Sequence, residues 1–372
     1  RPPFGGATAG PPKGLGGPPR HRGGGAGGHW GGAGPGVLGG GGADVELASA
    51  MAFDRATYLQ KTGDLSAARR EYERLGSRWP ESQWAADALE ARVAIAFEAG
   101  NLAAVDMLAE QFARDHPGHP LEPRVRQIHG RALLKHGSFE RAATLFENLR
   151  DSLAQASARA PAADAERGRA GTGLPPGSAR PAAVARSAEP DAAAEHQWLR
   201  GTTVYYLALA RLANREYAEC LAALEELPAE ELSAELTQGV LVARGSALIG
   251  LKRYAEVIEP LRAYLEANPQ GPDSAKCRAQ LIVSLVEEKR LDEADVVYRG
   301  LHDSDQQRAL LLQTTLYLAD AHARQGGHDR AAELYRRLAD KRNPQDFIAK
   351  GLDGLARVES PAADDSAADS GA

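Results

Sequence analysis

The feature that most constrains this chain is a spacing of 37 residues. The residues that keep this spacing, here called anchors, are Gly63, Gly100 and Gly137 and, after an interruption, Arg215, Lys252, Lys289 and Gly326. A fixed period of roughly 20–50 residues is typical of a solenoid, in which each unit buries its apolar face only against its neighbours. The sequence therefore predicts a repeat scaffold, a kind of protein that binds partners.

The residues around each anchor trace an apolar stripe with helical spacing. Small or β-branched residues stand five positions after each anchor: Ala68, Val105, Ala142, Cys220, Val257, Ala294 and Ala331. Small or aliphatic residues stand seven positions before it: Ala56, Val93, Gly130, Ala208, Gly245, Ile282 and Ala319. Larger apolar residues follow nine and twelve positions after most anchors, which continues one stripe along a helix. We expect two helices to approach closely at the small residues.

Three units close with a proline. Pro80, Pro117 and Pro269 each stand 17 residues after an anchor. Proline disfavours a helical conformation in the residue before it, so each proline marks the end of a second helix. Each unit is therefore predicted to be a helix, a short turn, a second helix and a stop.

This pattern resembles the tetratricopeptide repeat, which has small residues where its two helices cross, a late aromatic and a closing proline. The best matches are the run Gly63, Ala68, Tyr72 and Pro80 and the stretch 245–269. The resemblance covers about 44–150 and 196–359, although the period is three residues longer than the usual 34 and the early Trp is absent. The resemblance implies an all-α, right-handed superhelical solenoid of about seven helix-turn-helix repeats with a C-terminal capping helix.

Composition divides the chain into five parts. Residues 1–43 are expected to be a disordered Gly/Pro-rich segment, because 19 of the first 42 residues are Gly and few apolar groups offset the chain entropy. Residues 44–150 form a block of three repeats, and 196–359 form a block of four repeats with the cap. Residues 151–195 are interpreted as a flexible Ala/Gly/Pro-rich insertion, whose first ten residues could extend the preceding helix. Residues 360–372 are expected to be a disordered tail.

The insertion leaves two arrangements open. It either tethers two blocks that move independently, or it loops out from two blocks that stack. Beyond the last anchor, we expect a capping helix with five apolar residues near one face. These residues are Phe347, Ile348, Leu352, Leu355 and Val358.

No pattern indicates catalysis, a cofactor or a metal. His116 and His119 lie three residues apart in a loop, but the prolines after them argue against a shared helical face, and a metal needs three or four convergent ligands. Cys220 stands at a small-residue position and is interpreted as a packing residue. The net charge of −6 argues against a nucleic-acid binder. We therefore predict a non-enzymatic chain without cofactors.

Membrane association and compartment are only partly constrained by the sequence. No run approaches the roughly 20 apolar residues that span a bilayer. The chain begins with Arg, so an upstream anchor, signal or domain remains open. The junction at 79–89 resembles those of bacterial cell-envelope tetratricopeptide proteins. This resemblance favours a scaffold in the periplasm or cell envelope over one in the cytoplasm.

The tetratricopeptide resemblance also implies a binding face. In that family the positions ten and six before each anchor point into a concave groove, and here many of them are apolar. The partner-binding candidates are Tyr205, Leu209, Val242, Ser246, Val283, Leu316 and Asp320. Two interpretations weigh equally: a groove for a partner's peptide or helix, and ordinary packing within the superhelix.

The predicted function is a protein–protein interaction scaffold that holds a partner in this groove. The alternative is a recruitment or regulatory region of a larger enzyme, such as a kinase or peptidase, whose catalytic domain lies upstream. Partner identity and oligomeric state are not specified by these residues.

Overall fold

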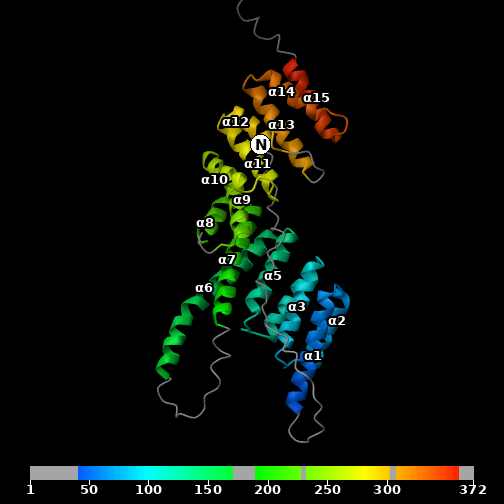
Figure 1. Cartoon of the computed structure of the whole chain (residues 1–372), viewed down its shortest axis with the longest axis vertical. Coiled ribbons are helices and arrows are strands. Elements are labelled where there is room, and N and C mark those ends of the chain that lie inside the picture. The colour runs from blue at the N-terminus through cyan, green and yellow to red at the C-terminus, as the bar shows by residue number, and fades with distance from the viewer. Residues whose placement is uncertain (1–40, 171–188, 228–231, 302–306, 360–372) are drawn as a thin grey trace, which may run out of the picture. The chain divides into compact units, whose positions relative to one another are not determined.

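The structure is a computed structural model, and it describes residues 41–170, 189–227, 232–301 and 307–359. Every element within these ranges is an α-helix (Figure 1). The chain divides into two compact units between Asn214 and Arg215. The predicted all-α fold is confirmed.

The N-terminal unit alternates first and second helices of the predicted repeats. Each helix packs against the next one in the chain, and α3, α5 and α7 also contact one another in turn, so that first helices form a layer. The first helices are α1 (Gly41–Lys61), α3 (Ala85–Glu98), α5 (Glu122–Lys135) and α7 (Glu189–Ala213). The second helices are α2 (Leu65–Arg78), α4 (Leu102–Asp115) and α6 (Phe139–Ala170).

The C-terminal unit repeats this arrangement. Consecutive helices pack together, and α9, α11, α13 and α15 form the layer of first helices. That layer comprises α9 (Ala234–Gly250), α11 (Ser274–Glu287), α13 (Arg308–Arg324) and α15 (Gln345–Glu359). The remaining helices are α8 (Tyr217–Glu225), α10 (Ala255–Ala267), α12 (Leu291–Tyr298) and α14 (His328–Leu338).

All seven anchors have a positive φ and lie in the turn between a first and a second helix. Their φ angles range from 61° at Lys252 and Lys289 to 87° at Gly63. At Gly63 the turn is a Schellman motif, in which the Gly63 N–H donates to Gln60 O and the Asp64 N–H donates to Leu59 O. The 37-residue period of the sequence thus reflects a residue in the left-handed backbone conformation, which recurs at the end of each first helix.

The small residues lie where the helices cross. The residues five positions after the anchors are all at most 1% exposed. Cys220 is among them, which confirms its interpretation as a packing residue, and no disulfide joins it to Cys277. At one of these crossings, Gly130 of α5 packs against the ring of Phe146 from α6. Close approach of each helix pair therefore holds the repeat together.

The closing prolines end the second helices as predicted. The helices α2, α4 and α10 each stop two residues before Pro80, Pro117 or Pro269. The intervening C-cap residues share one non-helical conformation, with φ between −133° and −136° and ψ between 57° and 64°. This similarity follows from the proline ring, which excludes the helical conformation from the preceding residue.

The long helix α6 continues well past the length of the other second helices and ends at Ala170. It therefore covers the first part of the predicted insertion, and α7 begins at Glu189, before its end. Residues 1–40, 171–188 and 360–372, on which the predictions of disorder mostly fall, lie outside the described residues.

The capping helix α15 is present, and four of its five expected apolar residues, Phe347, Ile348, Leu355 and Val358, are half-buried. Leu352 is 56% exposed, whereas Gly351 and Gly354 are buried. A Cβ on Gly354 would lie 2.3 Å from the ring of Tyr335 in α14. The two helices thus approach through glycines, and the larger apolar residues are displaced toward the edges of the contact.

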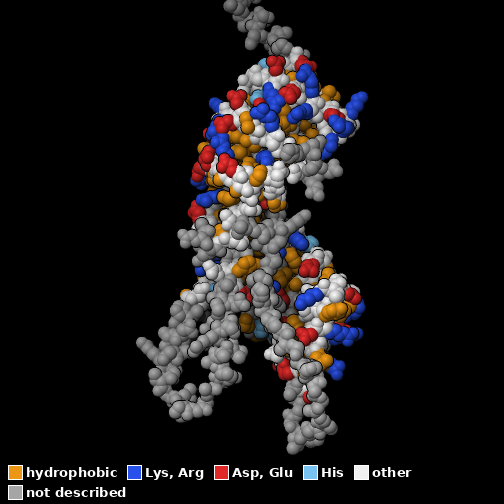
Figure 2. Space-filling view, viewed as in Figure 1, with side chains coloured by type: hydrophobic (Ala, Val, Ile, Leu, Met, Phe, Trp, Pro, Cys, Tyr) orange, Lys and Arg blue, Asp and Glu red, His pale blue; other side chains and the backbone are white. Residues whose placement is uncertain are grey.

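The surface of the C-terminal unit carries both signs of charge. Figure 2 shows Lys and Arg side chains interspersed with Asp and Glu over this unit, with hydrophobic atoms between them. No helix among the described residues is long and apolar enough to cross a membrane.

Candidate functional site

Four of the predicted groove residues contribute mainly to packing. Tyr205 and Leu209 of α7 are 1% and 4% exposed, and Val242 of α9 and Val283 of α11 are 2% and 0% exposed. First helices contact one another within each unit, in the pairs α5–α7, α9–α11 and α11–α13, so residues at these positions lie between helices. Their side chains offer little surface to a partner in this conformation.

The other three predicted residues are half-buried. Ser246 of α9 accepts a hydrogen bond from Gln280 Nε2 at 2.6 Å. Asp320 of α13 accepts one from the Tyr335 hydroxyl at 2.5 Å, and Arg357 Nη2 of α15 lies 3.9 Å from it. Leu316 lies one turn before Asp320 on the same helix. These residues retain accessible surface, but two of them already bridge neighbouring helices.

A cluster of cations and aromatic rings lies across three first helices of the N-terminal unit. The Arg131 guanidinium carbon lies 4.9 Å from the ring centroid of Phe97 on α3 and 5.2 Å from that of Tyr206 on α7. Lys135, one turn further along α5, places its Nζ 4.4 Å from the centroid of the Phe97 ring. We call Phe97, Arg131, Lys135 and Tyr206 the cation–aromatic cluster. The ring faces attract both cations and hold their side chains in place.

The cations of this cluster lack a carboxylate among the described residues. Neither Arg131 nor Lys135 forms an ion pair there, and Arg131 Nε is buried with no hydrogen-bond partner in the same part of the chain. Arg131 is half-buried and Lys135 is exposed. By contrast, Arg211 of α7 forms an ion pair with Glu147 of α6. The cluster therefore carries two positive charges that a ligand carboxylate could neutralise.

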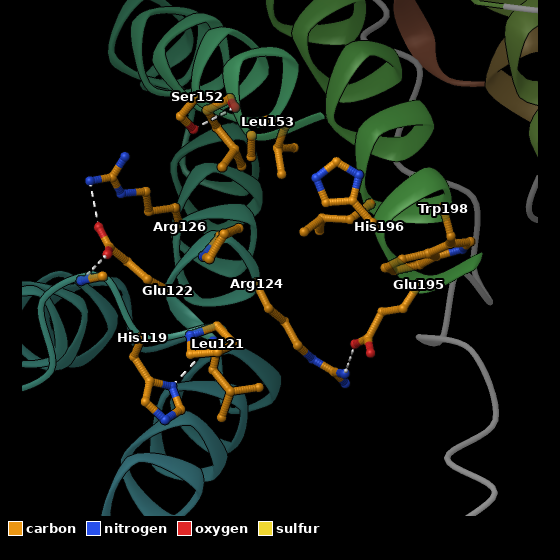
Figure 3. Close-up of a pocket in the computed structure, with 16 residues that line it drawn as sticks. His119, Leu121, Glu122, Arg124, Arg126, Ser152, Leu153, Glu195, His196 and Trp198 are labelled. Carbon is orange, nitrogen blue, oxygen red and sulfur yellow. Dashed lines mark hydrogen bonds and ion pairs between the residues drawn. The ribbon is translucent and has the colours of Figure 1, made fainter. Parts of the chain in front are cut away.

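A second feature of the N-terminal unit is a chain of charges from α3 to α7. Arg124 Nε of α5 lies 2.9 Å from Glu90 Oε1, and Arg124 Nη1 lies 3.5 Å from Glu195 Oε1 (Figure 3). Glu90 is only 5% exposed, so its charge depends on this arginine for compensation. Arg124 thus joins three first helices.

These charges border a cavity of about 600 Å³ between α5, α6 and α7 (Figure 3). Its apolar lining includes Leu121, Leu149, Leu153, Trp198 and Leu199. Arg126, His119, Glu122 and His196 also line it, and Figure 3 shows His196 projecting from the α7 side. The volume lies within the range of about 300–1,000 Å³ that is usual for ligand pockets.

The sequence analysis missed this cavity, because two of its walls flank the predicted insertion. Leu153 is 2% exposed and packs with Leu149, Leu199 and Trp198, although it lies in the Ala-rich stretch that showed few large apolar residues. The spacing of Leu149 and Leu153, four residues apart on one helical face, was the available signal.

His116 and His119, which the sequence analysis considered as metal ligands, and His129 of α5 contact other side chains of the N-terminal unit. His116 and His119 lie with ring centroids 6.0 Å apart, and both contact Phe112. His129 Nε2 lies 2.6 Å from Asp106 Oδ1 of α4. Within the described residues, no group of three or more His, Cys, Asp or Glu side chains is placed to hold a metal ion.

Comparisons with known proteins yield similar solved structures at low sequence identity. No protein-family model matches the chain, and no curated protein sequence matches it. Among solved structures, it is similar to a tetratricopeptide repeat protein from Parabacteroides merdae, with 10% identity and a TM-score of 0.47, over 83% of this chain and 99% of that one. It is also similar to an assembly chaperone of RpL4, with 19% identity and a TM-score of 0.45, over 77% of this chain and 99% of that chaperone.

A third similar structure is the tetratricopeptide domain of P58(IPK), with 14% identity and a TM-score of 0.27, over 84% of this chain and 98% of that domain. The predicted tetratricopeptide-type architecture agrees with the helix pairs, turns and crossing residues of this chain.

Proposed function

We propose that this chain is a non-enzymatic protein–protein interaction scaffold. Its first helices present a cation–aromatic cluster, and a partner segment that carries Asp or Glu binds there. The single observation that carries the proposal is the pair of cations, Arg131 and Lys135, held against aromatic rings without a carboxylate among the described residues.

The chemistry of this cluster suits a peptide better than an isolated ion. The ring of Phe97 is half-buried and adds apolar contact area next to the two charges. A carboxylate that binds a guanidinium makes a strong, directional hydrogen bond, and apolar atoms beside it add burial. A partner with an acidic residue next to an apolar one would bind the cations through its carboxylate and the ring of Phe97 through its apolar side chain.

The cavity beside α5, α6 and α7 and the half-buried groove positions extend this proposal. The cavity offers apolar walls for a side chain of the partner, with Trp198 at its edge. In the C-terminal unit, Ser246, Leu316 and Asp320 are the predicted groove residues that retain accessible surface, and we include them as contacts. Tyr205 and Leu209 support the contacts of the N-terminal unit from within, and Val242 and Val283 support those of the C-terminal unit.

The test is affinity capture with the full chain as bait, from a lysate of the organism that makes it. The test variant is Arg131→Glu/Lys135→Glu. The matched control is Arg69→Glu/Arg114→Glu, which reverses two exposed arginines on α2 and α4. Circular dichroism first establishes that all three proteins have the same helix content.

We expect a partner that the wild type and the control capture equally and that the double Glu variant loses at least tenfold. Equal capture by all three proteins would reject the cation–aromatic cluster as the binding surface. Capture of no partner by any of them would reject the scaffold function itself.

A further inference from the structure

The outward face of α1 carries an exposed stripe that the repeat array does not use. Its residues are spaced by three and four positions in alternation: Asp44, Leu47, Met51, Asp54, Tyr58 and Lys61. Leu47, Met51 and Tyr58 are 55%, 65% and 67% exposed. We call these six residues the α1 seam.

The opposite face of α1 is the one that holds the helix in the fold. Ala56 is fully buried, and Ala52 and Phe53 pack beside it against α2 and α3. Ala56 stands nine residues after Leu47, which places it half a turn from the seam on the helix. The apolar seam is thus additional to the face that folding requires.

The position of α1 explains why such a stripe is unusual. Internal first helices such as α5 have first helices on both sides, whereas α1 begins the described array. Apolar side chains that are exposed on a soluble protein are usually scattered singly. Three large apolar side chains on this face therefore indicate an interaction surface.

The spacing indicates what kind of surface would match. Alternating steps of three and four residues are the seam of a coiled coil, in which apolar residues of one helix pack into those of another. The seam therefore fits a second helix with the same spacing. A second copy of α1 supplies one.

The charges at the two ends of the seam determine whether two copies of α1 pair parallel or antiparallel. In an antiparallel pair that sets Asp44 against Lys61 of the second copy, Leu47 faces Tyr58 and Met51 faces Asp54. In a parallel pair, Asp44 would face Asp44 and Lys61 would face Lys61, and like charges repel. The charges at the two ends of the seam are thus complementary only in antiparallel pairing, in which Asp54 lies opposite an apolar residue.

We propose that the chain forms a homodimer through antiparallel pairing of the α1 seams of two copies. The contact is isologous, so it closes on itself and does not propagate into a filament. From Asp44 to Lys61 the seam is about 26 Å long, at about 1.5 Å per residue. A single helix pair of this length buries less than a standard interface, so the dimer is weak and concentration-dependent.

The experiment is sedimentation equilibrium of the full chain over about 5 to 500 µM at low salt, a range that brackets a micromolar Kd. We expect a monomer–dimer equilibrium. Leu47→Glu/Tyr58→Glu should abolish it, while Leu352→Glu, on exposed α15, should leave it unchanged. All the substituted side chains are exposed, so the fold should persist, and circular dichroism checks that it does.

Charge reversal then tests the register. Asp44→Lys and Lys61→Asp should each weaken dimerisation by roughly three- to tenfold, and the double variant should restore it, because an exposed ion pair contributes modestly and each pair occurs twice. Met51→Lys should strengthen the dimer by placing a cation opposite Asp54 of the second copy.

A chain that is monomeric at all these concentrations would overturn the proposal. So would a dimer that Leu47→Glu/Tyr58→Glu does not affect, or a double charge reversal that fails to restore association. If deletion of residues 1–40 turns a monomer into a dimer that depends on the seam, then those residues, and not a second copy, occupy the seam in the full chain, and the proposal also fails.

Discussion

The Cβ atom that Gly130 lacks would lie 2.5 Å from Cζ of Phe146, closer than any side-chain carbon can approach. Gly130 lies within α5, and Phe146 is fully buried in α6. Helix propensity alone would favour alanine at position 130 by about 1 kcal/mol. Helix propensity therefore predicts that Gly130→Ala raises the free energy of unfolding, whereas packing predicts that it lowers this free energy.

We expect packing to decide, because the Phe146 ring is enclosed and cannot move without disturbing the crossing. Gly130→Ala should lower the free energy of unfolding by about 1–3 kcal/mol. Gly76→Ala in α2 is the matched control, since a Cβ there meets nothing within 4 Å, and it should be neutral or stabilising. Urea denaturation measures both, and a stabilised Gly130→Ala would show that the two helices lie further apart.

The left-handed anchors predict a stabilising substitution. Lys289 has a φ of 61°, which a residue with a Cβ adopts at a cost of about 1 kcal/mol, and glycine adopts it freely. Lys289→Gly should therefore raise the free energy of unfolding by about 0.5–1 kcal/mol, despite the greater freedom of glycine in the unfolded chain.

The reverse change provides the control. Gly100→Ala places a Cβ at a φ of 70°, where space is open but the backbone is strained, and it should destabilise by about 1 kcal/mol. Thermal denaturation of both variants tests the pair. If Lys289→Gly melts lower than the wild type, the strain at this turn is not what limits its stability.

The sequence predicted the repeat unit because each of its parts recurs. Ala68 and Val257 stand five residues after their anchors, and both are buried at crossings. The position five residues after an anchor therefore predicts a buried crossing residue in every repeat. The left-handed conformation of Lys289 was also implicit, since it shares the period of Gly63 and Gly100. Periodic local structure is thus readable without knowledge of the tertiary contacts.

The candidate site was less predictable, because it depends on contacts that do not recur. Tyr205 was predicted to face the groove but is buried between helices, which only the packing of α7 against α5 and α6 reveals. Arg131 stands at a predicted groove position, six residues before Gly137, but its meeting with Phe97 of the preceding repeat depends on a contact that no periodic pattern marks. The cavity lined by Leu153 depends on the length of α6, which an Ala-rich composition did not define.

Overpacking of a crossing tests the register in the C-terminal unit. Ala294 of α12 is fully buried five residues after its anchor, so Ala294→Trp should destabilise by about 1–3 kcal/mol or more. Val296, two residues later, is 58% exposed, and Val296→Trp should change stability by less than about 0.5 kcal/mol. Equal melting temperatures for the two tryptophan variants would contradict the assignment of Ala294 to the crossing.

Two buried acidic groups of the C-terminal unit predict a loss of stability in alkali. Burial raises the pKa of the Cys277 thiol from 9.0 to about 12, and burial raises the pKa of the Tyr264 hydroxyl from 10.0 to about 12. Both groups keep their protons in the folded state at a pH where they lose them in the unfolded state. Their contribution to stability is therefore complete below pH 9 and is lost as the pH rises toward 12.

At about 1.4 kcal/mol per pKa unit, the upper limit on the fall in the free energy of unfolding across this range is about 4 kcal/mol for Cys277 and about 3 kcal/mol for Tyr264. Cys277→Ala removes the thiol whose pKa is raised more. Between pH 8 and pH 10.5, the free energy of unfolding of this variant should therefore fall by less than that of the wild type, whatever the two values are at pH 8. Urea midpoints at the two pH values measure the difference. Identical losses in both proteins would mean that Cys277 ionises in the folded state almost as easily as in the unfolded chain, and that the crossing of α10 and α11 admits water.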